Sequence, residues 1–445
     1  MTTAKGLIIA AASSGSGKTT ITLALLALLK RRGVAVASCK VGPDYIDPQF
    51  HARATGRPCF NLDGWAMRPA TLAHLVQQAT RDAELLVVEG VMGLFDGAPM
   101  DSTAGDAELA PGSTADIAAR SKLPVVLVLR AKGIGATAAA LLQGLKRHHR
   151  DVQVAGVIFN EVGGERHRAM LAQAAARADL PVLGCLPAFD DIALPSRHLG
   201  LVQAREHDSF DRYLERLSAH FAPHLALDAL CALASAPAIA QPEPVRAIRP
   251  LGQRIAVADD VAFGFSYAAT LLGWRTAGAE IVPFSPLADQ APDQGADAVF
   301  LPGGYPELHA GRLAGNRTFM GGLRHAAAKG AAVYGECGGY MTLGEGLIDA
   351  EGNRHAMAGL LPLVTSFAER KLHLGYRQGT LLADSPVGPA GRAFRGHEFH
   401  YATVVSEGPG ESLFAVEDAA CRNLGRQGRR QGSVFGSFLH LIDEA

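Results

Sequence analysis

The sequence predicts an α/β protein made of two α/β domains. In both halves of the chain, apolar runs of strand length alternate with helical stretches, which is typical of a parallel sheet connected by crossover helices. In each half, one of these strands breaks into a glycine-rich turn that opens a helix, at residues 7–20 and 331–341. Between them, residues 236–250 carry four prolines and no apolar period, which indicates an extended linker. We therefore expect domains at residues 1–235 and 251–445.

The composition bounds the class of protein. The 445-residue chain has 48% hydrophobic and 19% charged residues, which is typical of a globular protein with length for two or three domains. Its formal net charge of -1 predicts no electrostatic surface for nucleic acid. We see neither a signal peptide nor an apolar run long enough to cross a bilayer, and expect a cytoplasmic protein without a membrane partner. Six scattered cysteines without a Cys-x-x-Cys pair favour neither a zinc site nor a disulfide framework.

The first glycine-rich turn has the features of a phosphate-binding loop. After an apolar run, small residues lead to Lys18 and Thr19, which open a segment of strong helix formers. In such a loop the backbone N–H groups bind phosphate, the lysine reaches the outer phosphates and the threonine ligates Mg²⁺. Ala12 replaces the first glycine of the full motif, so we expect a departure from the usual turn. The alternative is a plain βα turn with a surface lysine. The residues expected to contact ATP are Ser14, Gly15, Ser16, Gly17, Lys18, Thr19 and Thr20.

Acidic residues follow the next strands, at the edge where open α/β sheets bind ligands. Asp44 lies on the turn after the strand expected at residues 34–40, and Glu89 ends the third strand. Asp96 lies on the glycine-rich loop that follows. Carboxylates in such places hold Mg²⁺ or orient a reacting group, and we expect Glu89 and Asp44 to join Thr19 as metal ligands. A turn or helix-cap role is the alternative for Asp44, and more so for Asp47.

The rest of the first half completes a mainly parallel sheet, with strands expected at residues 124–129, 152–159 and 180–186. Asn160 follows one of these strands and is a candidate for reading a nucleotide base, although a turn asparagine fits equally well. Residues 98–114 are expected to form a loop over the site. The basic candidates for binding an anionic substrate are Arg53, Arg57 and Arg197.

The second glycine-rich turn carries Cys337 at its apex, after strands expected at residues 254–258, around Ile281 and at residues 298–301. A thiol on such a turn is exposed, lies near a helix N-terminus that favours the thiolate, and can use the N–H of Gly338 to bind an oxyanion. Gly304 would supply the second donor. The alternative is a small buried hydrophobic residue. A short strand ending in His440 favours catalysis, because a histidine there can act as the general base.

Two other histidines compete with His440 for the role of general base. His397 and His400 lie in the segment Arg-Gly-His-Glu-Phe-His, which we interpret as a strand. They lack the i, i+4 spacing of a helical metal pair, so we expect no metal there.

Taken together, these motifs resemble the cobyrinic and hydrogenobyrinic acid a,c-diamide synthases of corrinoid biosynthesis. The resemblance covers essentially the whole chain and rests on the segments 14–20, 41–48, 88–97, 301–307, 335–340 and 397–401. It implies an N-terminal synthetase domain of the dethiobiotin-synthetase type. It also implies a C-terminal class I glutamine amidotransferase domain with a flavodoxin-like fold.

The resemblance implies roles for individual residues. Cys337 matches the glutaminase nucleophile and His440 its histidine, while acids with active-site roles match Asp44, Glu89 and Asp96. The positions that select the substrate match Tyr45 and Ile46. Most class I amidotransferases carry a glutamate two residues after the histidine, where this chain has Ile442. We therefore expect a Cys–His dyad and a slower or more tightly gated glutaminase.

The function that follows is the ATP- and glutamine-dependent amidation of the a and c acetates of hydrogenobyrinic or cobyrinic acid, through acyl phosphates. The metal-free substrate is favoured. ATP and Mg²⁺ are the expected cofactors. The expected partners are small molecules, and the oligomeric state to test is a homodimer. One alternative is a synthetase of similar layout that acts on another corrinoid or polycarboxylate. The other is a nucleotide-switch protein with a non-catalytic C-terminal half, related to the chromosome-partitioning ATPases.

Overall fold

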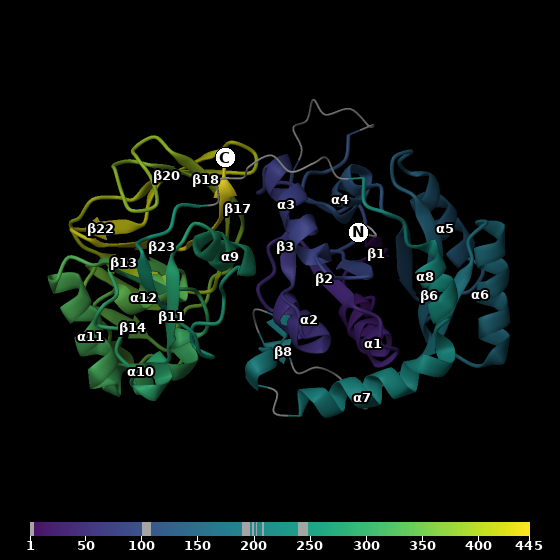
Figure 1. The fold of residues 1–445 in the computed structure, drawn as a ribbon, viewed down its shortest axis with the longest axis horizontal. Helices are drawn as coiled ribbons and strands as arrows, with labels where there is room; N and C mark the ends of the chain where they lie inside the picture. The colour runs from purple at the N-terminus through teal and green to yellow at the C-terminus, as the bar shows by residue number, and fades with distance from the viewer. Residues whose placement is uncertain are drawn as a thin grey trace. The chain divides into compact units, whose positions relative to one another are not determined.

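The computed structural model describes residues 4–99, 108–188, 196–197, 200–201, 203–206, 209–238 and 248–445. Most of the expected linker, the middle of the expected loop at residues 98–114 and the side chain of Arg197 lie outside these residues. The chain divides into two compact units, Met1–Trp65 with Pro69–Val245 and Ala66–Arg68 with Arg246–Ala445. Figure 1 shows the ribbon of both units, which are described separately below.

The first unit is built on a seven-stranded parallel sheet, in the order β3-β2-β4-β1-β5-β6-β7. Its strands are β1 (Lys5–Ala11), β2 (Val36–Val41), β3 (Phe60–Leu62), β4 (Leu85–Glu89), β5 (Val125–Arg130), β6 (Val154–Val162) and β7 (Val182–Pro187). Every residue of β1 after Lys5 is buried, as expected for a central strand covered on both faces. The carboxyl ends of β1, β4 and β2 lie side by side, since Glu89 pairs with Ile9 on one side and with Lys40 on the other.

Helices connect these strands along the chain. They are α1 (Lys18–Arg31), α2 (Asp47–Thr55), α3 (Pro69–Thr80), α4 (Thr114–Ser121), α5 (Ala138–Arg147), α6 (Glu165–Arg177), α7 (Phe210–Phe221) and α8 (Leu227–Leu233). Shorter elements are the hairpin of β8 (Ser196–Arg197) and β9 (Gly200–Leu201), and the 3₁₀ turns η1 (Ala204–Glu206) and η2 (Ala222–His224). The alternation of strand and helix explains the parallel sheet, because each crossover helix returns the chain to the end of the sheet where the strands begin.

The second unit is built on a six-stranded sheet, in the order β11-β10-β12-β13-β23-β22. All neighbours are parallel except the edge strand β22. The strands are β10 (Arg254–Ala258), β11 (Glu280–Phe284), β12 (Ala298–Leu301), β13 (Ala332–Glu336), β22 (Arg429–Gln431) and β23 (Val434–Ser437). Its helices are α9 (Ala268–Thr276), α10 (Ala310–Gly315), α11 (Arg317–Ala328) and α12 (Gly338–Leu343), with 3₁₀ turns η3 (Pro286–Ala288) and η4 (Pro306–His309).

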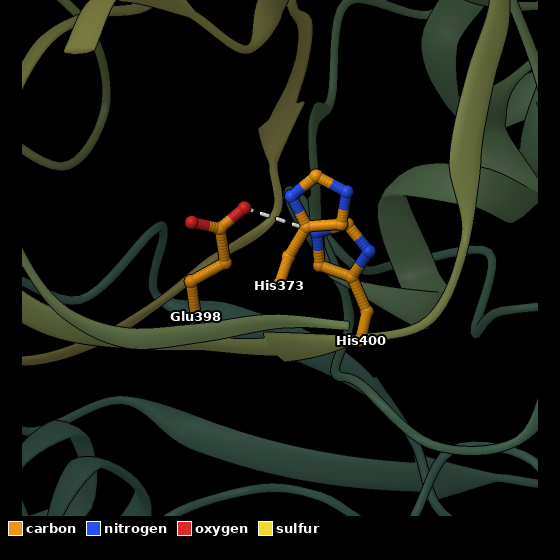
Figure 2. A group of neighbouring side chains, drawn as sticks. All are labelled: His373, Glu398 and His400. Carbon is orange, nitrogen blue, oxygen red and sulfur yellow. Dashed lines mark hydrogen bonds and ion pairs between the residues drawn. The ribbon is translucent and has the colours of Figure 1, made fainter. Parts of the chain in front are cut away.

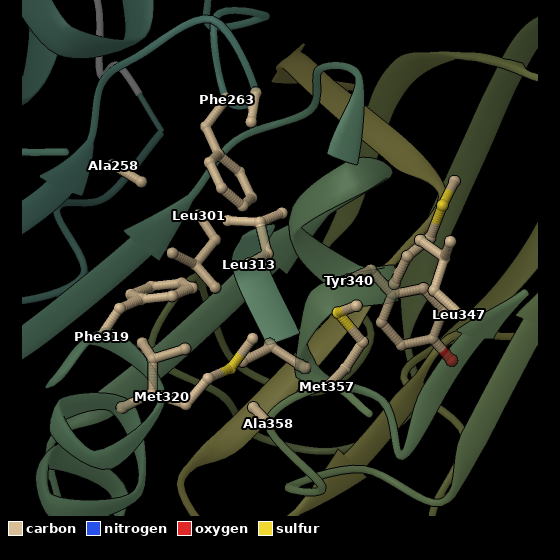
Figure 3. Packing of buried hydrophobic residues seen from close by; sticks show 14 of the residues in the cluster. Ala258, Phe263, Leu301, Leu313, Phe319, Met320, Tyr340, Leu347, Met357 and Ala358 are labelled. Atoms are coloured by element: carbon tan, nitrogen blue, oxygen red, sulfur yellow. The ribbon is translucent and has the colours of Figure 1, made fainter. Parts of the chain in front are cut away.

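Alternate residues of this sheet enter two different hydrophobic clusters. Val299 and Leu301 of β12 belong to one cluster, whereas Ala298 and Phe300 belong to the other. This alternation follows from the two-residue period of a strand and shows that both faces of the sheet are covered. Figure 3 shows the first cluster, in which Leu301 packs with Phe263 and Leu313.

Two smaller sheets complete the second unit. One has the order β15-β14-β16-β19, with β14 (Gly346–Ile348), β15 (Arg354–Ala356), β16 (Leu363–Ser366) and β19 (Thr403–Glu407). The other is antiparallel in the order β21-β20-β17-β18-β24, with β17 (His373–Leu381), β18 (Ala393–His400), β20 (Phe414–Asp418), β21 (Asn423–Gln427) and β24 (Leu439–Glu444).

The fold class predicted from the sequence, two α/β domains of which the first has a parallel sheet, is confirmed. The structure differs in one detail that concerns the site. The sequence predicts one strand that ends in His440, whereas β23 ends at Ser437 and His440 is the second residue of β24. The Ser437 hydroxyl accepts a hydrogen bond from the N–H of Leu439 at 3.2 Å, which bends the chain between the two sheets.

Candidate active sites

The phosphate loop of the first unit lies between β1 and α1. Gly15 and Gly17 have positive φ angles of 74° and 86°, a region that glycine enters without steric cost. Ala12 needs no such angle, so its substitution for glycine does not strain the loop. The Asn160 side chain donates a hydrogen bond to the Ser16 carbonyl at 3.0 Å. Asn160, which the sequence suggested for a nucleotide base or a turn, therefore contacts the loop backbone in this structure.

Lys18 opens α1 and is largely buried. Its Nζ donates a hydrogen bond to the Met92 carbonyl at 3.1 Å, which places the ammonium over the loop that follows β4. Burial, together with the neighbouring charge of Lys40, lowers the pKa of Lys18 against the opposing effect of nearby acids. An arriving phosphate would favour the charged form of this side chain.

Glu89 is fully buried at the end of β4 and has three side-chain partners. Its Oε1 accepts hydrogen bonds from the Thr19 hydroxyl at 2.6 Å and from Lys40 Nζ at 3.0 Å. Its Oε2 lies 2.7 Å from His51 Nε2. Burial alone would raise the pKa of Glu89, but Lys40 and His51 outweigh it and hold this pKa well below its usual range. Glu89 is therefore a carboxylate in a site where an isolated acid would be neutral.

Two aspartates after β2, Asp44 and Asp47, have different partners. Asp44 Oδ1 accepts the N–H groups of Ile46 at 2.7 Å and of Asp47 at 3.1 Å, so it caps the turn into α2. Asp47 Oδ2 lies 3.1 Å from Lys40 Nζ and 3.3 Å from the Thr19 hydroxyl. Burial and the charge of Asp44 raise the pKa of Asp47 to about 8. Asp47, ranked below Asp44 by sequence reasoning, is thus the aspartate whose side chain contacts Thr19.

Asp96, Tyr45 and Ile46 lie on the loops that follow β4 and β2. Asp96 Oδ2 accepts the N–H of Gly93 at 2.8 Å, which orders the loop after β4. Tyr45 and Ile46 are buried at the start of α2.

Sequence reasoning missed Lys40 and His51, two residues that contact Glu89. Lys40 is a lysine inside a strand in which every residue is buried, and that pattern is a usable signal for a buried ion pair.

The oxygen donors around Thr19 suit a hard cation. A hydroxyl and two carboxylates, from Thr19, Glu89 and Asp47, are the ligand types that Mg²⁺ prefers, and they converge next to the phosphate loop. Lys40 Nζ contacts both carboxylates, so its ammonium supplies the positive charge between them. The donor set therefore fits Mg²⁺, on condition that Lys40 shifts.

The second unit carries the thiol. Cys337 links β13 to α12 with φ 48° and ψ −105°, a conformation that strains a non-glycine residue. The glycines that follow Cys337 make the sharp turn possible, because a Cβ on Gly339 would lie 1.9 Å from the Leu301 carbonyl oxygen. Burial, and next the charge of Glu307, raises the pKa of the Cys337 thiol. This differs from the expectation that the helix N-terminus favours the thiolate, since desolvation outweighs the helix end.

Two glycine backbones approach each other beside the turn that carries the thiol. A Cβ on Gly338 would come within 3.1 Å of the backbone nitrogen of Gly304, so the two turns are in contact. A Cβ on Gly304 would lie 2.1 Å from the Ala262 carbonyl oxygen, which only glycine avoids. This proximity is what an oxyanion hole made of two backbone donors requires.

His440 and Cys337 both lie next to Gly303. A Cβ on Gly303 would lie 2.8 Å from His440 Nε2 and 3.3 Å from the Cys337 Cβ. Burial lowers the pKa of His440 to about 3, helped by the charges of His397 and His400. A neutral imidazole in that position can accept the thiol proton. On the opposite edge of the ring, Nδ1 lies 3.7 Å from Glu336 Oε2.

The two rival histidines lie on β18, beside this pair. His397 is in register with His440 of β24, and burial lowers the pKa of His397 to about 3. His400 Nε2 lies 3.0 Å from Glu398 Oε1, and the His400 ring stacks on that of His373 with 4.7 Å between centroids (Figure 2). One ligand atom each from His373, Glu398 and His400 lies within 4.8 Å of the others, a grouping that could hold a metal ion and that the spacing of the histidines in the sequence did not predict.

Comparison with known proteins gives relatives over the full length. A family described as "CobQ/CobB/MinD/ParA nucleotide binding domain" matches residues 7–202, and one described as "CobB/CobQ-like glutamine amidotransferase domain" matches residues 254–445. A protein of Rhizobium meliloti (strain 1021) named "Hydrogenobyrinate a,c-diamide synthase" is 53% identical over 98% of this chain and 99% of its own. A Sinorhizobium protein of the same name is 51% identical over 99% of both chains.

A solved structure titled "Crystal structure of glutamine amidotransferase" is 18% identical, with a TM-score of 0.29 over 42% of this chain and 89% of that one. Among the residues that the structure describes, no helix has both the length and the apolar character needed to span a membrane.

Proposed function

We propose a function from one premise: the chain belongs to the hydrogenobyrinate a,c-diamide synthase family. It is a glutamine-dependent amidotransferase ligase of cobalamin biosynthesis that uses ATP. Its reaction is the amidation of the a and c acetate carboxylates of hydrogenobyrinic acid. The observation that carries the proposal is the presence, in one chain, of a phosphate loop beside Glu89 and of Cys337 beside His440.

In the first unit the proposed chemistry is activation of a carboxylate. A carboxylate is a poor acylating agent because its leaving group would be oxide, so transfer of the γ-phosphoryl group of ATP to a carboxylate oxygen forms an acyl phosphate that ammonia can displace. The loop from Ser14 to Thr20 binds the phosphates, and Lys18 offsets the charge of the group in transfer. Mg²⁺, when bound with ATP, supplies further positive charge at the phosphates. Thr19, Glu89 and either Asp47 or Asp44 would hold it.

The remaining residues of this unit have proposed roles in recognition. Asp44 and Asp96 position the substrate carboxylate, directly or through the turns that they cap. Tyr45 and Ile46, buried at the start of α2, contact the macrocycle and select it. Asn160 fixes the phosphate loop and borders the nucleotide.

In the second unit the proposed chemistry is hydrolysis of glutamine. The Cys337 sulfur attacks the side-chain amide carbon while its proton passes to His440 Nε2, and the N–H groups of Gly304 and Gly338 bind the oxyanion. His440 then gives that proton to the leaving nitrogen, which departs as ammonia and leaves a thioester. Water activated by His440 hydrolyses the thioester to glutamate and restores the thiol.

Further features of the proposal concern the whole chain. We place the synthetase domain at residues 1–235, the linker at 236–250 and the amidotransferase domain at 251–445. We place the enzyme in the cytoplasm, and we propose a homodimer without a nucleic-acid partner. The metal-free corrinoid is proposed as the substrate because relatives at 51–53% identity are named for it.

The test is mass spectrometry of the corrinoid after incubation with purified protein, Mg-ATP and glutamine. Hydrogenobyrinic and cobyrinic acid are supplied in separate reactions. We expect two successive acid-to-amide conversions of hydrogenobyrinic acid. Conversion of cobyrinic acid alone would move the protein to the cobalt-containing branch. Hydrolysis of ATP without conversion of either acid would contradict the proposal and favour another polycarboxylate or a nucleotide switch.

A further inference from the structure

We propose that Glu336, the residue just before the nucleophile, is the acid that positions His440 in the glutaminase site. This inference rests on the proposed glutaminase function of Cys337. It addresses the position two residues after the histidine, where this chain has the apolar Ile442. The structure supplies a carboxylate from a different strand instead.

Glu336 and His440 face each other from adjacent parts of the second unit. Glu336 is the last residue of β13, and His440 follows β23, the parallel neighbour of β13. Glu336 Oε2 lies 3.7 Å from His440 Nδ1, and both side chains are buried. Catalytic hydrogen bonds are often long in the free enzyme and tighten when substrate binds, so this separation suits a positioning contact.

The Glu336 carboxylate is held firmly on its other oxygen. Oε1 accepts the backbone N–H of Leu441 at 3.1 Å and the hydroxyl of Tyr334 at 2.9 Å. Leu441 directly follows His440, so the carboxylate is tied to the backbone that carries the histidine. The Tyr334 ring stacks on Phe300 and on Phe435, with centroid distances of 5.7 and 4.9 Å, which limits its movement. Oε2 is thereby left directed at the imidazole.

The orientation of the ring gives this contact a chemical consequence. The Nε2 edge of His440 lies over Gly303, beside Cys337, whereas Nδ1 lies toward Glu336. A carboxylate at Nδ1 favours the tautomer that carries its proton there, which leaves the Nε2 lone pair free for the thiol proton.

Two other acids of this unit, Asp443 and Glu398, have different partners. Asp443, three residues after His440, accepts hydrogen bonds from the backbone N–H of Arg68 at 2.9 Å and its Nε at 3.0 Å. Glu398 has one oxygen on Arg377 and the other on His400. Glu336, by contrast, has Oε2 3.7 Å from His440 Nδ1, and this placement matches the role.

The test compares E336Q with Y334F in the full-length protein, above about pH 8, because burial raises the pKa of Glu336 to about 8 and the carboxylate must be ionised. In E336Q the amide oxygen keeps the bonds from Leu441 and Tyr334, while the amide nitrogen donates to Nδ1 and forces the proton onto Nε2. We expect the glutaminase kcat to fall about 100-fold or more, with the KM for glutamine changed less than about threefold. Amidation with ammonium salts should be unchanged.

Y334F is the matched control, because it removes one of the two donors to Oε1, while the Leu441 N–H still holds the carboxylate and Oε2 keeps its place. We expect its glutaminase kcat to stay within about fivefold of the wild type. Equal losses in the two variants, or an E336Q protein with wild-type kcat, would overturn the proposal in favour of a structural role. If E336Q does not fold, E336D replaces it, and wild-type kcat in E336D has the same meaning. A wild-type protein that releases no glutamate from glutamine would instead overturn the proposed function itself.

Discussion

At the scale of single residues, the first unit contains a buried ion pair that is shielded from water. Lys40 and Glu89 are both buried and lie 3.0 Å apart. Burial opposes the charge on Lys40, but the neighbouring acids outweigh it and raise the pKa of this lysine. Removing one partner of such a pair leaves an uncompensated buried charge, which typically costs about 3–5 kcal/mol. Substitutions at Glu89 therefore mix catalysis with stability, and Thr19 is a cleaner probe.

Replacement of Thr19 by valine tests the proposed Mg²⁺ site. The change keeps the shape of the side chain and removes the hydroxyl that contacts Glu89 and Asp47. We expect ATP-dependent amidation with ammonium salts to fall about 100-fold and to require more Mg²⁺. Thr22→Val is the control, since the buried Thr22 hydroxyl bonds the Lys18 carbonyl instead. Equal activities of the two variants would remove Thr19 from the metal site.

Replacement of Glu398 by glutamine tests the charge network of the second unit. Burial raises the pKa of Glu398, but His400 and Arg377 outweigh it and bring this pKa to about 2. A carboxylate whose pKa is lowered by folding stabilises the fold at pH values above 4.5, its usual pKa. This contribution is lost as pH falls toward about 2. We expect E398Q to be about 3 kcal/mol less stable at neutral pH, with the difference narrowing below about pH 4.5.

The measurement for E398Q is calorimetric unfolding of the variant and the wild type at several pH values. The control is E417Q on β20, where the exposed side chain should change the stability by less than about 0.5 kcal/mol. A stability difference that does not depend on pH would show that the ionised form of Glu398 is not what stabilises the unit.

At the scale of elements, the turn from β13 into α12 depends on glycines that permit close approach. The chain passes from strand to helix in one residue, Cys337, and α12 lies directly against β12. The same arrangement brings the backbones of Gly304 and Gly338 close together. The geometry of the proposed oxyanion hole is therefore a product of how closely two backbones pack.

Replacement of Gly339 by alanine tests this packing. The added Cβ would lie 1.9 Å from the Leu301 carbonyl oxygen, so the helix must shift. We expect a loss of about 3 kcal/mol in the unfolding free energy of the second unit, with loss of glutaminase activity. Gly321→Ala on α11 is the control, because nothing lies within 4 Å of its Cβ and alanine favours a helix by about 0.5–1 kcal/mol. A stable, active G339A protein would contradict the packing argument.

At the scale of the whole molecule, the chain joins two chemistries that share ammonia. Glutamine hydrolysis in the second unit supplies the nitrogen, and the first unit supplies an activated carboxylate. The two activities should therefore separate by nitrogen source, because free ammonium bypasses the glutaminase.

Replacement of Cys337 by alanine should reduce glutamine-dependent amidation about 1,000-fold or more and leave ammonium-dependent amidation intact. Lys18→Ala is the matched variant, and it should lose amidation from both nitrogen sources because phosphoryl transfer fails. Product mass and glutamate release are measured for each. A C337A protein that still uses glutamine would show that the nucleophile is another residue.

Local sequence was sufficient for the two α/β domains, the phosphate loop and the turn that carries Cys337. Strand length, glycine turns and helix starts are set by neighbouring residues, so these features are visible without tertiary structure. Which side chains meet is a different matter. Lys40 and His51 contact Glu89 from separate elements, and Glu336 approaches His440 across 104 positions of sequence. Burial then decides protonation, which no local pattern reports, because desolvation and partner charges depend on the whole packed unit.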